Sequence, residues 1–461
     1  MRALAHLLLC LVLSPAIIAF NMSGASALSL DGAVRIAVDK SPEVLEAMAN
    51  SRAVGEELNQ ARSLYRPNVN IESFIGPEFV DQPNSLSVDE NEEWRNSRQV
   101  SGVARWTLFN GFFRGNEMFR QATRLEGSGY RILEAGELVA LDTVEAYVDV
   151  LRHKRILQAS DLNIAQHRQI LSLARSQFDG GAATRGEVEL ALERLSAAEA
   201  VRAEVLRALG EVEARFERLV GQKPILLRSA PFPRSTPRTL EDALAVARAS
   251  HPTLEAAFLE VEALEATVEQ QTASALPEVS IEGRGSHGFD IGGTAGKDNE
   301  LSLRLVMTWA LYDGGLRNAQ RREQIQRVGE AKRRLDRFRL DIEETTRRTW
   351  SGIVTNDERL AALRRQLTQS ERVLAAYYEE YEAGVRSLLD ILDAQNARFN
   401  AEFEVASAES IAIFSRYQLI GSTGQLLDYF GIEQTLPEIE FRDENLRIYR
   451  TGGGLLEPLR R

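Results

Sequence analysis

The sequence contains an internal duplication, and this is the feature that most limits how the chain can fold. The stretch 28–47 (LSLDGAVRIAVDKSPEVLEA) recurs at 238–256 (RTLEDALAVARASHPTLEA), and Pro67 in YRPNVNIE recurs as Pro277 in ALPEVSIE; both offsets are 210 residues. Three later pairs are 203 residues apart: WTLFNGFFR at Trp106 with WALYDGGLR at Trp309, FDGG at Phe178 with YEAG at Tyr381, and VGQ at Val220 with TGQ at Thr423. The register therefore slips once, by seven residues, between positions 67 and 106, which predicts a tolerant loop there.

Both copies have the same order of predicted elements. A short amphipathic segment leads to Pro42 or Pro252, a residue that suits the first turn of a second helix. Two strands follow, then a long helix, a turn and a returning helix. The predicted ranges are strands at about 67–80, 98–109, 277–290 and 299–312, and helices at about 111–178, 185–219, 314–381 and 387–427. The sequence thus predicts two repeats, 28–223 and 239–432, joined by a proline-rich linker at 224–238.

The two ends of the chain lie outside the duplication. Residues 1–27 combine a positive charge at Arg2, an apolar run and a small-residue triplet, which is typical of a secretory signal peptide. An N-terminal membrane anchor is the alternative, but the apolar run is short for a spanning helix. Cys10, the only cysteine, lies in this segment, so a mature chain would contain no disulfide. The tail 433–461 matches nothing in the repeats and is expected to be largely unstructured.

The predicted strands alternate between apolar and polar residues. From Glu300, ELSLRLVMTWALY places leucines, Met307 and Trp309 on one face and polar residues on the other. A soluble sheet alternates identically. Predicted export, strand lengths of about 9 to 13 residues, and Trp106 and Trp309 at equivalent strand ends, as on one side of an aromatic girdle, favour a membrane β-barrel. Four strands cannot close a barrel and an open edge in lipid would leave backbone groups unpaired, so several copies must join.

The helical stretches are too long for an ordinary globule. No proline lies at 84–223 or 278–436, and these stretches are rich in Ala, Leu, Glu and Arg. A helix of 68 residues, the length of 111–178, would be about 100 Å long. Apolar residues such as Leu138, Leu141 and Val144 recur at three- and four-residue steps, which indicates packing against neighbouring helices. A solitary periplasmic coiled coil would share this periodicity; direct connection to barrel strands favours one continuous tube.

The segment 381–399 (YEAGVRSLLDILDAQNARF) puts two like charges, Asp390 and Asp393, on one helix face. Ser387 with Asp390 matches the capping-box pattern, as Thr184 with Glu187 does in the other copy, so Asp390 has a sufficient structural role. The counterparts of Asp393 and Arg386 are uncharged: Leu190 and Ala183, respectively. These two charges are therefore the stronger candidates for function.

The chain resembles the TolC family of outer-membrane channel proteins over about residues 28–432. The features that carry this resemblance are the duplicated halves, the LFNG and LYDGG junctions, the FDGG turn and the segment 381–399. The resemblance implies a mainly α fold with a membrane β part: three chains form a twelve-stranded β-barrel continued by a twelve-helix α-barrel. It implies an exit duct for type I secretion or multidrug efflux, in the outer membrane of a Gram-negative bacterium and extending into the periplasm. The expected partners are two further copies of the chain, a periplasmic adaptor (membrane fusion) protein, an inner-membrane ABC or RND transporter, and outer-membrane lipid.

The resemblance also implies roles for individual residues. Asp390 and Asp393 would form stacked carboxylate rings at the pore constriction, which select cations. Arg386, Tyr381 and Glu187 would be polar links that hold the mouth shut, and we hypothesise that Arg386 pairs with Glu187 or with an acidic group of a neighbouring chain. The turns would be tips that face the adaptor, comprising Gly180, Gly181, Ala182, Gly384 and Val385.

Other functions are less favoured. Asp and Glu number 67 against 55 Lys and Arg, and this acidity argues against nucleic acid as a partner. No phosphate-binding glycine loop or nucleophile elbow occurs, so neither an enzyme nor a cofactor is expected. The histidines after residue 27 lack metal-ligand spacing: His153, His167, His251 and His287. A periplasmic scaffold or adhesin built on coiled coils without a pore remains the alternative.

Overall fold

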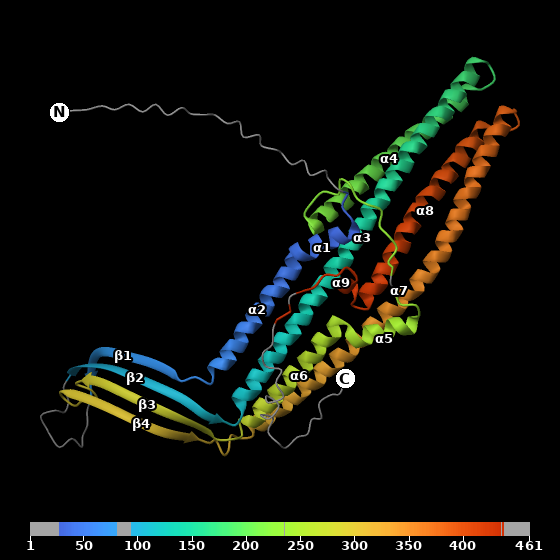
Figure 1. Cartoon of the computed structure of the whole chain (residues 1–461). Helices are drawn as coiled ribbons and strands as arrows, with labels where there is room; N and C mark the ends of the chain where they lie inside the picture. Colours follow the sequence, from blue (N-terminus) through green and yellow to red (C-terminus); the bar gives the residue numbers. More distant parts are fainter. Residues whose placement is uncertain (1–26, 81–93, 235, 435, 438–461) are drawn as a thin grey trace, which may run out of the picture.

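The computed structural model describes residues 27–80, 94–234, 236–434 and 436–437 (Figure 1). A four-stranded sheet lies at one end of the molecule, and long helical hairpins extend away from it (Figure 1). The helices are α1 (Leu30–Lys40), α2 (Pro42–Ser63), α3 (Phe113–Asp179), α4 (Arg185–Val220), α5 (Leu240–Ser250), α6 (Pro252–Ala273), α7 (Leu316–Glu382), α8 (Leu388–Ser422) and α9 (Leu426–Tyr429). The strands are β1 (Asn68–Phe79), β2 (Trp94–Asn110), β3 (Glu278–Phe289) and β4 (Lys297–Thr308). The expected signal peptide and nearly all of the tail lie outside the described residues.

Apart from the short helix α9, the elements of the two halves correspond one to one. Helices α1 and α5 both have 11 residues, α2 and α6 both have 22, and α3 and α7 both have 67, which makes each of the last two about 100 Å long. Strands β1 and β3 begin 210 residues apart, whereas α3 and α7 begin 203 apart. The seven-residue slip therefore falls within the strand hairpins, as the sequence predicted.

The strand boundaries differ from the predicted ranges at two places. Strand β2 begins at Trp94, four residues before the predicted start, because it pairs with β1 as far as Phe79. Strand β4 ends at Thr308 rather than 312. Its partner β3 begins at Glu278, directly after Pro277, a residue that cannot donate a backbone hydrogen bond. The last predicted residues of the strand therefore have no ladder to join.

The long returning helix also ends earlier than predicted. Helix α8 stops at Ser422, and Gly424 follows with φ +72°, a conformation that favours glycine. The short helix α9 then packs against α3. The Glu137 carboxylate accepts hydrogen bonds from the amides of Leu426 and Leu427, both at 2.9 Å. Burial raises the pKa of Glu137 to about 7, although these two amides act in the opposite direction.

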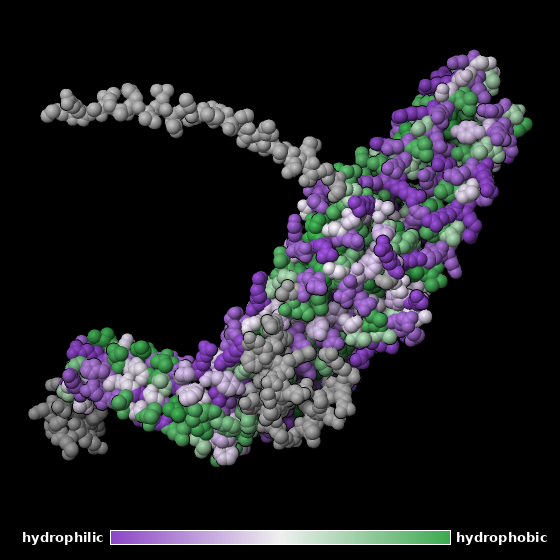
Figure 2. All heavy atoms as spheres, in the orientation of Figure 1, coloured by the Kyte–Doolittle hydropathy of each residue, from purple (hydrophilic) through white to green (hydrophobic). Residues whose placement is uncertain are grey.

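The sheet is antiparallel in the order β1-β2-β3-β4, and its two faces differ in polarity. Hydrophobic side chains cover much of the strand region next to the helices (Figure 2). On β4, Leu301 is 92 % exposed and Leu303 is 79 % exposed. Exposed large apolar side chains on this face include Val69, Ile71, Ile75, Val100, Trp106, Leu301, Leu303, Leu305 and Met307. Among the described strands, β1 and β4 each pair on one side only.

The helices pack around a core in the middle of the rod. This core contains α1, α9 and parts of α3, α4 and α8, with Tyr147, Phe216 and Tyr417 fully buried. The Tyr147 hydroxyl lies 2.8 Å from the carbonyl oxygen of Leu28 and 2.7 Å from that of Arg228, which anchors the proline-rich linker to α3. In the described part of the chain, no helix contains a stretch both long and apolar enough to cross a membrane.

Candidate functional site

The hairpin turns α3–α4 and α7–α8 lie at the end of the molecule far from the sheet (Figure 1). Gly181 and Gly384 occupy equivalent places in the two turns, with φ of +76° and +77°. Glycine suits these places because a Cβ atom disfavours a positive φ. Val385, next to Gly384, is 74 % exposed. The residues predicted as adaptor-facing tips thus sit together at one end of the molecule.

An apolar cluster joins the two hairpins just behind the turns. It combines residues of all four helices, including Ile170, Ala174, Ala191, Leu388 and Ile391. Tyr381 is part of this cluster, and its hydroxyl lies 2.5 Å from the Oε1 atom of Gln177 on α3. Burial raises the pKa of the Tyr381 phenol, and the negative charge of Glu187 adds to this shift. Tyr381 therefore forms a polar link between α7 and α3 in the single chain.

Arg386 contacts its own hairpin rather than the other one. Its Nε atom donates to Oε2 of Glu380 at 2.6 Å, and its guanidinium lies 4.2 Å from the centre of the Tyr377 ring. Glu187, its hypothesised partner, instead accepts a hydrogen bond from the Thr184 amide at 2.7 Å. The Arg386–Glu187 pair is therefore wrong for the single chain, because each residue has a nearer partner.

Both predicted capping boxes are confirmed. Thr184 with Glu187 caps α4, and Ser387 with Asp390 caps α8. The hydrogen bond from the Ser387 hydroxyl, together with the Ser387 amide, holds the pKa of Asp390 below its usual value.

Asp393 has a different environment. Its carboxylate lies 3.7 Å from the guanidinium of Arg194 on α4, and its side chain is 63 % exposed. This contact joins the two hairpins one turn beyond the cap. Arg194 was not among the residues predicted from the sequence. Its counterpart in the second copy, Ala397, is uncharged. A charge that occurs in one copy alone was the signal that could have found it.

A buried polar contact lies further along the same helices. The amide nitrogen of Gln395 on α8 donates to Oδ1 of Asn163 on α3 at 2.8 Å, and the Gln395 residue is fully buried. Gln166 accepts from Gln395 and also from Arg398, the latter at 3.0 Å. These residues were also missed, because a polar residue among apolar neighbours in one helix does not reveal its partner in another.

At the opposite end, the two predicted girdle tryptophans occupy equivalent places. The Trp106 indole nitrogen donates to the carbonyl oxygen of Tyr65 at 3.0 Å, and that of Trp309 donates to Ala275 at 3.1 Å. Both side chains are about half exposed. Each lies where a strand meets the helices, so the two tryptophans mark the same end of the sheet.

Two arginines brace these junctions. Arg114 on α3 donates to the carbonyl oxygens of Thr107 and Leu108 at 2.7 and 2.8 Å. Arg317 on α7 donates to Ala310 at 2.7 Å and to Ser274 at 3.1 Å. Arg114 thus ties the start of α3 to β2, and Arg317 ties the start of α7 to the segment that follows β4 and to the end of α6. The signal for this role was present, since both arginines end the repeated WTLFNGFFR and WALYDGGLR motifs.

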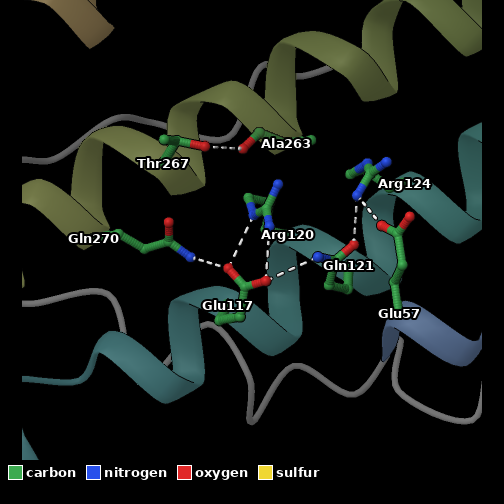
Figure 3. Close-up of polar contacts among 8 residues, drawn as sticks. All are labelled: Glu57, Glu117, Arg120, Gln121, Arg124, Ala263, Thr267 and Gln270. Atoms are coloured by element: carbon green, nitrogen blue, oxygen red, sulfur yellow. Dashed lines mark hydrogen bonds and ion pairs between the residues drawn. The ribbon is translucent and has the colours of Figure 1, made fainter. Parts of the chain in front are cut away.

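A polar network joins three helices close to the sheet (Figure 3). The Glu117 carboxylate accepts two hydrogen bonds from Arg120, at 2.9 and 2.7 Å, one from Gln121 at 2.8 Å, and one from Gln270 of α6 at 2.5 Å. Arg124 pairs with Glu57 of α2. Burial alone would raise the pKa of Glu117, but these donors outweigh it and the pKa lies below its usual value. The charged Glu117 carboxylate therefore joins α3 to α6, and the Arg124–Glu57 pair joins α3 to α2.

Among the residues that the structure describes, no group of three or more His, Cys, Asp or Glu side chains could hold a metal ion.

Known proteins share both the sequence and the architecture of this chain. A family model described as outer membrane efflux protein matches residues 33–222 and 243–425, which follow the two repeats. The chain is 26 % identical over 431 residues to the outer membrane efflux protein BepC of Brucella suis biovar 1 (strain 1330), covering 91 % of this chain and 92 % of BepC. It is 22 % identical over 444 residues to the outer membrane protein TolC of Salmonella enteritidis, covering 92 % and 89 %.

Solved structures show the same fold. The outer-membrane channel OprN superposes with a TM-score of 0.74 at 21 % identity, over 86 % of this chain and 89 % of OprN. The CmeC outer membrane channel of Campylobacter jejuni also gives a TM-score of 0.74, at 14 % identity, over 92 % of this chain and 89 % of CmeC. The resemblance drawn from the duplicated halves is confirmed. The chain belongs to the outer membrane efflux protein family.

Proposed function

We propose that this outer-membrane channel protein assembles as a homotrimer and serves as the exit duct of a tripartite efflux or type I secretion system. The observation that carries the proposal is the open sheet. One of its faces is apolar and exposed, its outer strands β1 and β4 each lack a second partner among the described strands, and its helix-proximal end continues into rods of 67 residues.

The open sheet requires further copies of the chain. Backbone groups at a strand edge in lipid have no water to bind, so the edges must pair. The smallest bacterial barrels have about eight strands, which two copies would supply, and three copies would supply twelve. The resemblance of the hairpin ends to the TolC family also implies three copies.

Relatives support both kinds of export. BepC is named as an efflux protein, and the 22 % identical AprF of Pseudomonas aeruginosa is named as an alkaline protease secretion protein. For efflux and for secretion alike, the partners in this proposal are a periplasmic adaptor and an inner-membrane transporter.

The periplasmic end is the proposed gate. Asp390 and Asp393 of three copies form carboxylate rings at the constriction, while Tyr381, Arg386 and Glu187 hold the hairpin ends. The cross-hairpin contacts support this assignment: Tyr381 to Gln177 and Asp393 to Arg194 both join α7–α8 to α3–α4. Opening then requires α7–α8 to move away from α3–α4, which breaks both contacts. The exposed turns with Gly181 and Gly384 are the surface that an adaptor meets.

Planar-bilayer recordings test the channel and its constriction together. The purified protein should insert and conduct ions, and multivalent cations added from the periplasmic side should block the current. The double variant Asp390→Asn, Asp393→Asn should be blocked less, because it lacks the carboxylates that attract cations. Glu189→Gln, an exposed charge on the other hairpin, is the matched control and should be blocked like the wild type.

Two outcomes would contradict the proposal. A protein recovered from the soluble periplasmic fraction that forms no conducting pores would support a coiled-coil scaffold instead. Normal conductance with unchanged block in the double variant would remove the two aspartates from the constriction and leave the channel itself intact.

A further inference from the structure

Cationic side chains gather on the apolar face of the sheet, at its far end from the helices. Arg98 of β2 is opposite Phe289 of β3, which in turn is opposite Lys297 of β4, so these three residues form one row across the sheet. The Arg98 guanidinium lies 4.6 Å from the centre of the Phe289 ring, and the Lys297 ammonium lies 5.9 Å from it. The aromatic ring between them orients both cations.

A histidine lies beside this row. The His287 ring, two residues along β3, meets the Phe289 ring edge-on with 5.3 Å between the ring centres. The His287 Nδ1 atom lies 2.6 Å from Oδ1 of Asn299 on β4. Arg98, His287 and Lys297 are all exposed. We call Arg98, His287, Phe289 and Lys297 the cationic rim.

The cationic rim lies at the end of the apolar band of the sheet that is farther from the helices. Side chains at alternate positions of a strand share a face, so Lys297 lies on the same face as Leu301, Leu303 and Met307. Trp309 lies at the other end of this band, 12 positions from Lys297, or about 40 Å along the chain. For a strand tilted by about 45°, this length spans roughly 28 Å, close to the thickness of the hydrocarbon core. With the tryptophans at the inner interface, the cationic rim lies at the headgroups of the outer leaflet.

The rim charges differ from the cations on the other face of the sheet. On that polar face, Arg105 lies 3.4 Å from Glu278 and 3.3 Å from Glu282, and Arg304 lies 3.2 Å from Glu300. Within the part of the chain that the structure describes, neither Arg98 nor Lys297 forms an ion pair. Cations at a membrane interface are stabilised by anionic lipid. The two rim charges therefore face the place where anionic headgroups lie.

We propose that the cationic rim binds the phosphate of a phosphorylated glycolipid in the outer leaflet. The Arg98 fork and the Lys297 ammonium hold the phosphate by charge-assisted hydrogen bonds. Acyl chains of the same lipid lie along the band of Val100, Leu301 and Leu303. The inference rests on the outer-membrane location of the channel and goes beyond its export role, since this site faces lipid and not the pore.

Native mass spectrometry of the full-length assembly tests this site. The protein is titrated in detergent with diphosphorylated lipid A and, separately, with the same lipid after removal of its phosphates. Wild type should retain the phosphorylated form more strongly. The double variant Arg98→Gln, Lys297→Gln should bind it about 10- to 30-fold more weakly, since each cationic residue near an anionic surface contributes roughly a factor of five. Arg284→Gln is the matched control, because this arginine lies on the polar face of β3 and should leave binding unchanged.

Equal binding by wild type and double variant, or equal retention of the dephosphorylated lipid, would overturn the proposal. Displacement of the lipid by millimolar inorganic phosphate would also overturn it, because it would indicate a general anion site. Heat-modifiable migration on gels verifies that the variants assemble. If the double variant fails to assemble, the single variant Lys297→Gln on the outer strand β4 should bind about fivefold more weakly, and unchanged binding there counts against the site. Channel conductance of the rim variants should match the wild type, so failure of this inference leaves the export function untouched.

Discussion

Individual charged residues at the hairpin ends have separate roles. Asp390 closes the start of α8, and the Ser-x-x-Asp pattern predicts this role because capping depends on residues three positions apart. Asp393 instead contacts Arg194, a residue of the other half of the chain. Local sequence cannot identify such a partner, since the contact depends on how two hairpins pack. The comparison between repeats still singled out Asp393 correctly as a charge that capping does not require.

The partner of Arg386 could not be identified from local sequence either. Arg386 was singled out because the other repeat has no charge at this position. Its partner in the structure is Glu380, which lies close to it across the turn. Glu187 does not pair with Arg386, because the Glu187 carboxylate caps α4. The predictions therefore held for the two capping boxes, which span one turn of helix, and missed Arg194 as the partner of Asp393 in the other hairpin.

Replacing Arg386 by Ala should loosen the proposed gate. The change removes the ion pair with Glu380 and the stacking on Tyr377, both of which hold the end of α7 in place. We therefore expect a larger single-channel conductance in planar bilayers. Arg185→Ala is the matched control, because Arg185 lies at the other hairpin turn and forms an ion pair within its own helix, with Glu189. Equal conductance of wild type and Arg386→Ala would mean that this arginine does not restrain the mouth.

At the scale of elements, the sequence predicted the order of helices and strands but not all of their ends. Helix length followed from the absence of proline and from regular apolar spacing, which are local properties. The end of β4 depended on where its partner begins, at Glu278, and this is a property of the paired sheet. Likewise, the bracing of the junctions by Arg114 and Arg317 depends on carbonyl groups that become available only where strand and helix meet.

The strand-to-helix junction also offers a comparison between the two halves. Gly111 and Gly314 occupy equivalent places and have φ of +66° and +69°. A Cβ atom on Gly111 would lie 2.3 Å from the carbonyl oxygen of Ala273, whereas a Cβ atom on Gly314 would meet nothing within 4 Å. Gly111 is thus required both by its positive φ and by the close approach of Ala273, whereas Gly314 is required by its positive φ alone.

Alanine substitutions at these two glycines should differ in cost. Gly314→Ala should lower the free energy of unfolding by about 1 to 2 kcal/mol, the cost of a left-handed conformation. Gly111→Ala should lower it by more, since the start of α3 must also move away from α6. Thermal unfolding of the detergent-solubilised assembly measures both. Equal shifts in the midpoint would indicate that α6 does not approach Gly111 as closely as the structure shows.

At the scale of the whole molecule, the duplication constrains how copies meet. The β1–β2 pair Asn68–Arg105 recurs as the β3–β4 pair Glu278–Thr308, with the same offsets of 210 and 203 residues as the sequence repeats. Strands β1 and β3 are therefore equivalent, as are β2 and β4. The contact that closes the ring, between β4 of one copy and β1 of the next, should then have the register of β2 with β3.

This symmetry gives a residue-level register for an interface between copies. Val103 of β2 is opposite Arg284 of β3, away from the irregularity between Thr107 and Phe109. Applying the two offsets, Val306 of one copy should be opposite Phe74 of the next. Directly opposed residues in antiparallel strands have Cα atoms about 4.5 to 5.5 Å apart, which suits a disulfide bond.

Cysteines at these two positions should link the copies into a closed ring. The double variant Val306→Cys, Phe74→Cys should form covalent dimers and trimers on oxidation, visible after denaturing electrophoresis without reductant. Cys10, the only native cysteine, lies in the expected signal peptide and should not interfere. The control pair Val306→Cys, Gly76→Cys is displaced by two residues, about 7 to 8 Å apart, and should link poorly because a disulfide does not span that distance. Efficient linking of the control alone would mean that the outer strands meet in a shifted register. Absence of linking in both pairs would mean that β1 and β4 of different copies are not neighbours, which would contradict the barrel itself.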